Sequence, residues 1–151
     1  MSGAFLPEAK FSIPRDGGEL AYFRYGKPSS RNILAIHGVT SSNRAWQLFA
    51  KTAVKNGFTV YAVDLRGRGD SNSITGPFGM RAHADDMVAV LDHIGIKSCD
   101  VIGHSMGAFV VAAMCGLAPE RLSKVIFVDG GVPLALPPGF TVEQIMPLVL
   151  G

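Results

Sequence analysis

Several features that mark specialised classes of protein are scarce in this sequence. Two cysteines are too few for a disulfide framework or a cysteine-rich metal site. Lysine and arginine never stand next to each other and the formal net charge is +2, so no basic surface for nucleic acid is expected. The N-terminus has neither a basic segment nor a long apolar one, which argues against a secretory signal and predicts a cytoplasmic protein.

Apolar residues are plentiful, but no run of them predicts a membrane span. They make up 48% of the 151 residues, enough for one globular domain with a sizeable core. The longest apolar stretch, residues 101–118, is broken by glycine, histidine and serine, which favours a strand followed by a buried helix. Cys99 and Cys115 are expected near one end of the sheet, where the geometry allows a bridge, but a reducing cytosol favours two free thiols.

Strand and helix patterns alternate along the chain. Expected strands cover residues 11–13, 20–25, 33–36, 58–63, 101–102 and 124–129, and expected helices cover residues 44–55, 79–94 and 106–117. Asp-Gly-Gly at residues 16–18 predicts an antiparallel hairpin between the first two strands. Asp85 and Asp86 are expected on the wet side of the second helix or near its first turn. The order predicts the α/β class, with a mostly parallel sheet flanked by helices.

The pentapeptide Gly-His-Ser-Met-Gly at residues 103–107 lies where a strand pattern changes to a helix pattern. At such a turn the central residue, Ser105, is expected at positive φ, and the flanking glycines let strand and helix pack closely. The next amide, that of Met106, then lies at a helix N-terminus, where developing negative charge is stabilised. The pattern predicts a nucleophilic serine, and the alternative is a purely structural turn.

This pentapeptide resembles the nucleophile elbow of the α/β-hydrolase superfamily. His-Gly-Val at residues 37–39 and Asp-Leu-Arg-Gly-Arg-Gly-Asp-Ser at residues 64–71 resemble two further blocks of that family, in the same chain order. The resemblance implies a truncated α/β-hydrolase fold of the serine-nucleophile, esterase- or lipase-like branch. Residues 1–132 would be the N-terminal part of the catalytic domain. Residues 133–151, which begin in a proline- and glycine-rich connector, would start a cap or lid segment.

The resemblance also implies roles for the loops around the elbow. The backbone amides of Val39 and Met106 would form an oxyanion hole. His37 would fix its loop by hydrogen bonding, without moving a proton. Asp64 and Arg66 would form a structural pair. The glycine-rich loop after them lacks the third glycine of a dinucleotide motif, so no phosphate site is expected there.

A serine nucleophile needs a base, and the base needs an orienting acid; in this family the chain order is serine, acid, histidine. Asp129, at the end of the strand after the elbow helix, is the candidate acid, and a residue beyond Gly151 is the alternative. All four histidines precede Ser105. Solvated or capping roles are expected for His83 and His93. Either the catalytic histidine therefore comes from polypeptide outside this sequence, or this chain does not hydrolyse anything.

A serine at the elbow, where dehalogenases and epoxide hydrolases of the family carry aspartate, implies acyl transfer to water through an acyl-enzyme on Ser105. The expected substrate is a small hydrophobic ester, thioester or similar acyl compound, and no metal or cofactor is implied. Without a histidine after the serine, the chain alone is expected to be inactive. The alternatives are a non-catalytic fragment or interaction protein with a hydrolase-like half fold, and a cofactor-free peroxidase.

The last expected strand bears on the partners of the chain. Its segment from Val125 to Val128 is apolar throughout and would form an exposed sheet edge, which is a template for pairing with another chain. The expected partner is a missing C-terminal half or a second copy related by two-fold symmetry.

Overall fold

The computed structural model describes residues 3–132 and, beyond them, residues 139, 141, 143–144 and 147. The expected cap segment, residues 133–151, therefore lies largely outside the described residues, and the division of the chain at residue 132 stays a prediction. In the described part of the chain, no helix is long and apolar enough to cross a membrane.

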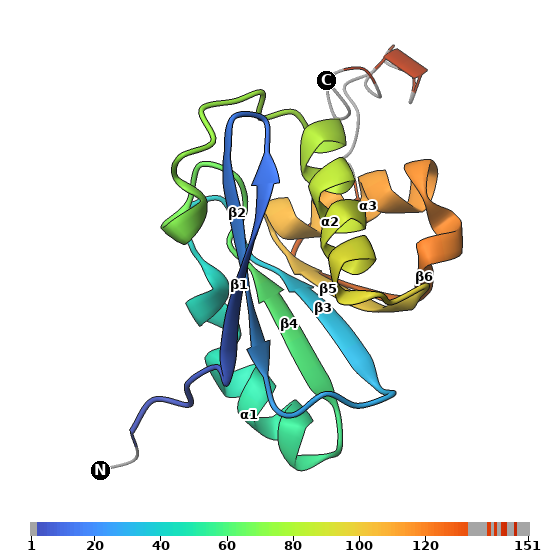
Figure 1. Ribbon diagram of the computed structural model, residues 1–151. Coiled ribbons are helices and arrows are strands. Elements are labelled where there is room, and N and C mark those ends of the chain that lie inside the picture. The colour runs from blue at the N-terminus through green and yellow to red at the C-terminus, as the bar shows by residue number, and fades with distance from the viewer. Residues whose placement is uncertain (1–2, 133–138, 140, 142, 145–146, 148–151) are drawn as a thin grey trace.

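Strands and helices alternate around one sheet, as the sequence predicts (Figure 1). The strands are β1 (Ala9–Arg15), β2 (Gly18–Tyr25), β3 (Asn32–Ile36), β4 (Thr59–Val63), β5 (Cys99–His104) and β6 (Leu122–Val128). The α-helices are α1 (Gln47–Lys55), α2 (Met80–Ile94) and α3 (Met106–Leu117), with short 3-10 turns η1 (Asn43–Trp46), η2 (Gly69–Ser71) and η3 (Pro119–Arg121). Strand β5 is longer than expected because both of its edges are paired, to β3 and to β6.

The strand order is β1-β2-β4-β3-β5-β6. Strand β2 runs antiparallel to β1 and β4, whereas β4, β3, β5 and β6 run parallel to one another. Asp16 (φ 43°) and Gly17 (φ 78°) form the two-residue turn between β1 and β2, where a hairpin requires positive φ at both positions. The mostly parallel sheet with an N-terminal antiparallel hairpin is thereby confirmed.

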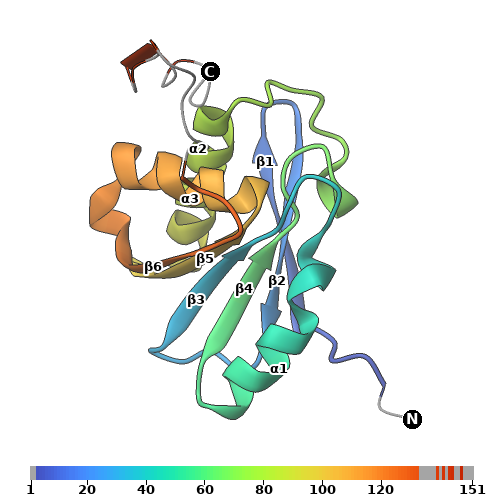
Figure 2. The same cartoon turned by 180° about the vertical axis from the view of Figure 1, so that it is seen from behind.

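Helix α1 covers one face of the sheet, and α2 and α3 cover the other (Figures 1 and 2). Alternate residues of each strand therefore enter different cores. In β3, Leu34 and Ile36 join the core under α2 and α3, whereas Ile33 and Ala35 join the core under α1. Burial on both faces explains why this strand is a continuous apolar run.

An ion pair is buried beneath α2, at a position that was expected to face water. The carboxylate of Asp86 is fully buried and accepts two hydrogen bonds from the guanidinium of Arg66, at 2.7 and 2.8 Å. Arg66 also donates to Asp16 at 2.6 Å, so it joins α2 to the hairpin turn. The hydrogen bonds with Asp86, followed by that with Asp16, raise the pKa of Arg66. The expected wet position holds only for Asp85, which is exposed.

The predicted pair of Asp64 with Arg66 is wrong. The buried Asp64 carboxylate instead accepts hydrogen bonds from the backbone and side-chain nitrogens of Asn43, at 2.7 and 2.9 Å, and from the Asp70 amide at 2.9 Å. It therefore fixes the loops after β3 and β4 against each other.

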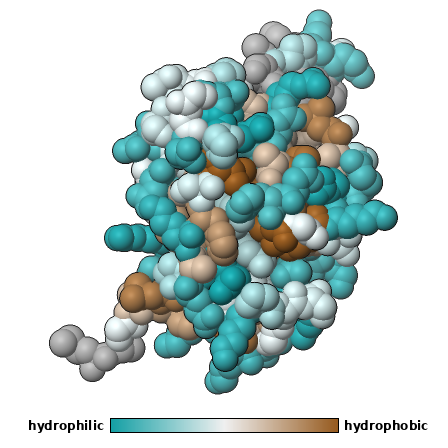
Figure 3. Space-filling view, viewed as in Figure 1, coloured by the Kyte–Doolittle hydropathy of each residue, from teal (hydrophilic) through white to brown (hydrophobic). Residues whose placement is uncertain are grey.

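The outer surface is mixed in character. On the face seen in Figure 3, hydrophobic side chains gather in separate patches among hydrophilic ones. Arg81, Asp85 and Asp92 of α2 are among the exposed polar residues. This matches the apolar stripe that the sequence places on the inner side of this helix.

The buried ion pair leads to a stability prediction. We expect Asp86→Asn to lower the free energy of unfolding by about 3 kcal/mol, because it removes the buried carboxylate and leaves Arg66 with only the half-exposed Asp16 as an acidic partner. The matched change Asp85→Asn removes the same charge from an exposed position and should change the free energy by less than about 0.5 kcal/mol. Urea unfolding followed by circular dichroism compares the two. Equal effects of the two variants would contradict the structural role of Asp86.

Candidate active site

Ser105 occupies a strained turn between β5 and α3. Its backbone has φ 53° and ψ −117°, a conformation that side-chain-bearing residues rarely adopt. Hydrogen bonds on both sides hold it there: the Ser105 amide donates to the Val128 carbonyl at 2.9 Å, and the Ala108 amide donates to the Ser105 carbonyl at 3.0 Å. The expected positive φ is therefore present, and the side chain is half-buried at the carboxyl end of the parallel strands.

Two glycines make this turn sterically feasible. A Cβ on Gly103 would collide with the carbonyl oxygen of Gly107, and a Cβ on Gly107 would collide with the carbonyl oxygen of Ile36 at the end of β3. The helix thus packs on the strand ends by backbone contact. A third glycine, Gly38, lies beside the serine, where an added Cβ would be 3.3 Å from the Ser105 Cβ.

The backbone amides of Val39 and Met106 are the candidate oxyanion donors. Met106 is the first residue of α3, so its amide has no acceptor within the helix, and the positive end of the helix dipole lies there. Val39 follows β3 in the loop beside Ser105, and its side chain is half exposed. Among the described residues, neither amide donates a hydrogen bond. Both are therefore available to a ligand oxygen near the serine.

His37 is buried in the loop after β3 and is fully engaged. Its Nε2 accepts a hydrogen bond from the Leu65 amide at 3.0 Å, so Nδ1 carries the proton and donates to the Gly38 carbonyl at 2.6 Å. Burial lowers the pKa of His37 and keeps the ring neutral. The residue ties the loop after β3 to the loop after β4, in agreement with the expected loop-fixing role.

Asp129, the candidate acid, follows β6 with φ 51° and is exposed. It lies next to the elbow because Val128 pairs with His104, the residue before the serine. The topology thus brings Asp129 and Ser105 to adjacent strand ends. Its role as the triad acid stays a prediction.

No histidine in the described part of the chain hydrogen-bonds to the Ser105 hydroxyl. His37 is engaged as described, and His93 bonds to the Tyr22 hydroxyl at 2.5 Å. His104 is exposed. The source of the catalytic base stays a prediction.

His83 differs from the solvated or capping residue that was expected. Its ring is fully buried, and neither ring nitrogen has a hydrogen-bond partner among the described residues. The pKa of His83 is lowered to about 4, mainly by burial. The positive charge of Arg68 also lowers this pKa, and the negative charge of Asp86 offsets that effect only in part. The helical spacing of α2 places His83 on the apolar stripe. The sequence prediction places it in solvent because histidine is a polar residue.

Sequence reasoning also missed Arg68, whose side chain lies between the loops of the site. Its guanidinium donates to the Val39 carbonyl at 3.1 Å and to the Arg66 carbonyl at 3.0 Å. The glycines on either side of Arg68 mark a loop, but no pattern in the sequence indicates where its side chain points.

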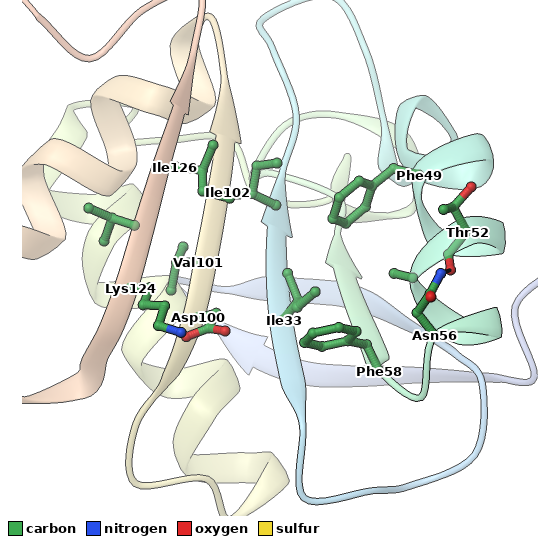
Figure 4. A pocket seen from close by; sticks show the side chains of 12 residues that line it. Ile33, Phe49, Thr52, Asn56, Phe58, Asp100, Val101, Ile102, Lys124 and Ile126 are labelled. Atoms are coloured by element: carbon green, nitrogen blue, oxygen red, sulfur yellow. Dashed lines mark hydrogen bonds between the residues drawn. The ribbon is translucent and has the colours of Figure 1, made fainter.

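An apolar hollow lies away from Ser105. It has a volume of about 670 Å³ and opens between α1 and the free side of the sheet (Figure 4). Phe49 of α1 and Ile33, Ile102 and Ile126 of the sheet line it, and Lys124 lies beside Asp100 at one end (Figure 4). It is therefore an uncovered stretch of sheet face, distinct from the site at the strand ends.

Comparisons with known proteins agree with this geometry. The family model described as alpha/beta hydrolase fold matches residues 31–151. The bifunctional esterase/perhydrolase DCH of Acinetobacter calcoaceticus is 30% identical over 80% of this chain and 44% of its own length. Lipase LipV of Mycobacterium tuberculosis is 31% identical over 74% of this chain and 41% of its own. The crystal structure of epoxide hydrolase A from Mycobacterium thermoresistibile superimposes with a TM-score of 0.75 and 27% identity, covering 97% of this chain and 46% of that one.

The chain belongs to the α/β-hydrolase family. It corresponds to the N-terminal portion of that fold and spans less than half the length of the relatives named above.

The strain at the elbow can be measured. We expect Ser105→Gly to be about 1 kcal/mol more stable than Ser105→Ala, because glycine adopts φ 53° without penalty while alanine keeps the strain. Both variants remove the hydroxyl, so the comparison isolates the backbone. Thermal and urea unfolding of the two proteins provide the measurement, and a less stable glycine variant would contradict the strained geometry.

A second prediction concerns acid stability. The folded-state pKa of His83, about 4, is below the value of about 6.5 in an unfolded chain. Its neutral burial therefore contributes stability that is complete above pH 6.5 and is lost as the pH falls toward 4. We expect the free energy of unfolding of His83→Leu to fall by roughly 3 kcal/mol less than that of the wild type between pH 7 and pH 4. Urea titrations across this range test it, and parallel pH profiles would refute it.

Proposed function

We propose that the chain is the nucleophile-bearing part of a serine hydrolase that transfers an acyl group to water. The observation that carries the proposal is the backbone of Ser105, which is strained, lies at a helix N-terminus and is flanked by two amides with no other partner among the described residues. Strain of this kind is maintained by surrounding structure and is concentrated at functional sites. A simple structural turn would use glycine at this position.

The chemistry follows from these groups. The Ser105 hydroxyl attacks the acyl carbon while its proton passes to a histidine base, and the Val39 and Met106 amides stabilise the negative oxygen. The alcohol or thiol then leaves with the proton held by the base. Water, deprotonated by the same base, attacks the resulting ester. The bond to the Ser105 oxygen breaks, the carboxylic acid leaves, and the base returns the proton to Ser105. Asp129 would orient the base, and no metal or cofactor takes part.

Serine at the elbow favours acyl substrates over epoxides. The relatives named above include an esterase, a lipase and an epoxide hydrolase, so the family match alone supports only a hydrolase. An ester or thioester offers a carbonyl carbon for a serine hydroxyl and an oxygen for the two amides. The apolar Val39 and Phe78 side chains, both about half exposed, favour a hydrophobic acyl group.

The base must then come from polypeptide that pairs with this chain. Among the described residues, strand β6 pairs with β5 alone, and three of its apolar residues are exposed: Ile126 at 53%, Phe127 at 39% and Val128 at 38%. The hollow between α1 and β6 continues this uncovered surface. We propose that the remaining half of the fold, and with it the histidine, adds to the β6 edge, in preference to a second copy of this chain.

A fluorophosphonate probe with intact-mass spectrometry tests the proposal. The 151-residue chain alone should show no probe adduct, because Ser105 has no base. Protein isolated from its source should contain the remaining half, as a longer chain or a second polypeptide, and should gain one adduct on Ser105.

The controls separate the alternatives. Ser105→Ala should abolish the adduct, while Ser98→Ala, at an exposed serine before β5, should leave it unchanged. A source protein of 16.0 kDa that ignores the probe would overturn the hydrolase and favour a binding protein. Labelling of the isolated chain would overturn the inference that its catalytic base comes from other polypeptide.

A further inference from the structure

Arg68 connects the segments that form the candidate site. It lies in the loop after β4, and its side chain reaches the loop after β3 and the start of α3. Its Nε donates to the Val39 carbonyl at 3.1 Å, and one terminal nitrogen lies 3.8 Å from the Met106 sulfur. One side chain therefore contacts both residues whose amides are the candidate oxyanion donors.

Hydrogen bonds hold the backbone of Arg68 in place. The Arg68 amide donates to the Leu65 carbonyl and the Arg68 carbonyl accepts from the Ser71 amide, both at 2.9 Å. Its second terminal nitrogen bonds to the Arg66 carbonyl, and Arg66 is held by the buried ion pair with Asp86. The guanidinium is thus anchored before it reaches Val39, as preorganisation requires.

The charge of Arg68 is not neutralised by a carboxylate. Of the ion pairs among the described residues, none includes Arg68, whereas Arg15, Arg66 and Arg121 each have an acidic partner. The Arg68 side chain is half-buried, and this burial lowers its pKa. Its neighbour on the open side is the ring of Phe78, 5.9 Å from the guanidinium carbon. Burying a cation costs free energy. A hydrogen bond to the Val39 carbonyl could be made by a neutral donor, so that bond alone does not require the positive charge of Arg68.

We propose that Arg68 is a positioning residue for the oxyanion hole: it restrains the backbone of Val39 by bonding its carbonyl oxygen, which lies one peptide unit after the donor amide, it contacts the Met106 sulfur, and it supplies positive charge near the oxygen that becomes negative. This inference rests on the proposed function. Arg68 acts through Val39 and Met106 and leaves the proton transfers to the triad.

Two variants separate the hydrogen bonds of Arg68 from its positive charge. Arg68→Gln removes the charge and the fork of donors, and Arg68→Lys keeps the charge but loses the bond geometry. Arg81→Gln, at an exposed arginine of α2, is the matched control. Circular dichroism and thermal unfolding establish that each variant is folded; if Arg68→Gln is not, Arg68→Lys carries the test.

The first measurement needs no activity. In nuclear magnetic resonance spectra of the isolated chain, Arg68→Gln should shift the Val39 and Met106 amide signals, because the Val39 carbonyl and the Met106 sulfur both lose their contact with the guanidinium. Arg81→Gln should change neither amide. Unchanged Val39 and Met106 signals in a folded Arg68 variant would overturn the inference.

The second measurement uses the source protein or its recombinant equivalent with the remaining half. Arg68→Gln should slow the maximal rate of labelling by the fluorophosphonate about ten-fold without weakening its initial binding, and Arg68→Lys should recover part of the rate. An equal labelling rate in Arg68→Gln would overturn the inference. If the wild type itself is not labelled, the proposed function fails, and the amide measurement alone decides whether Arg68 positions Val39 and Met106.

Discussion

The close backbone approach around Ser105 is the constraint on which the rest of the structure depends. Helix α3 reaches the ends of β5 and β3 only because Gly103 and Gly107 have no Cβ. That approach forces Ser105 to positive φ and directs the first amides of α3 toward the loop after β3. The serine, the helix dipole and the Val39 loop are therefore consequences of one packing contact, made without any side chain.

Buried polar groups transmit this geometry to the neighbouring loops. His37 joins the loops after β3 and β4, Asp64 joins the second of these to η1, and Asp86 holds Arg66 from α2. Each group has hydrogen-bond partners on a segment distant in sequence, so each of these loops restrains the next. Such a frame fixes the positions of loops that have no regular structure of their own, which is what the proposed oxyanion hole requires.

Much of the fold was predictable because its signals are local. The alternation of apolar runs with helical stripes predicts the parallel sheet, Asp16 and Gly17 predict the hairpin, and residues 103–107 predict the strained serine. The interior positions of Asp86, His83 and Arg68 were not predictable, because they depend on contacts with distant segments. Asp86 and Arg66 are 20 residues apart, and Arg68 and Met106 are 38 apart. Helical periodicity predicts which face of a helix a residue lies on, but it does not predict that a distant arginine packs against that face.

The apolar edge of β6 has a consequence for how such a fold is made. During synthesis the N-terminal segments leave the ribosome first, at roughly 5 to 20 residues per second. Once β6 has paired with β5, no described segment covers its other edge or the adjoining hollow, and both are exposed to other chains. The nascent chain is thus most vulnerable to wrong pairing at the moment when its serine elbow is already built. Protection of this strand edge during synthesis then affects the yield of folded chain.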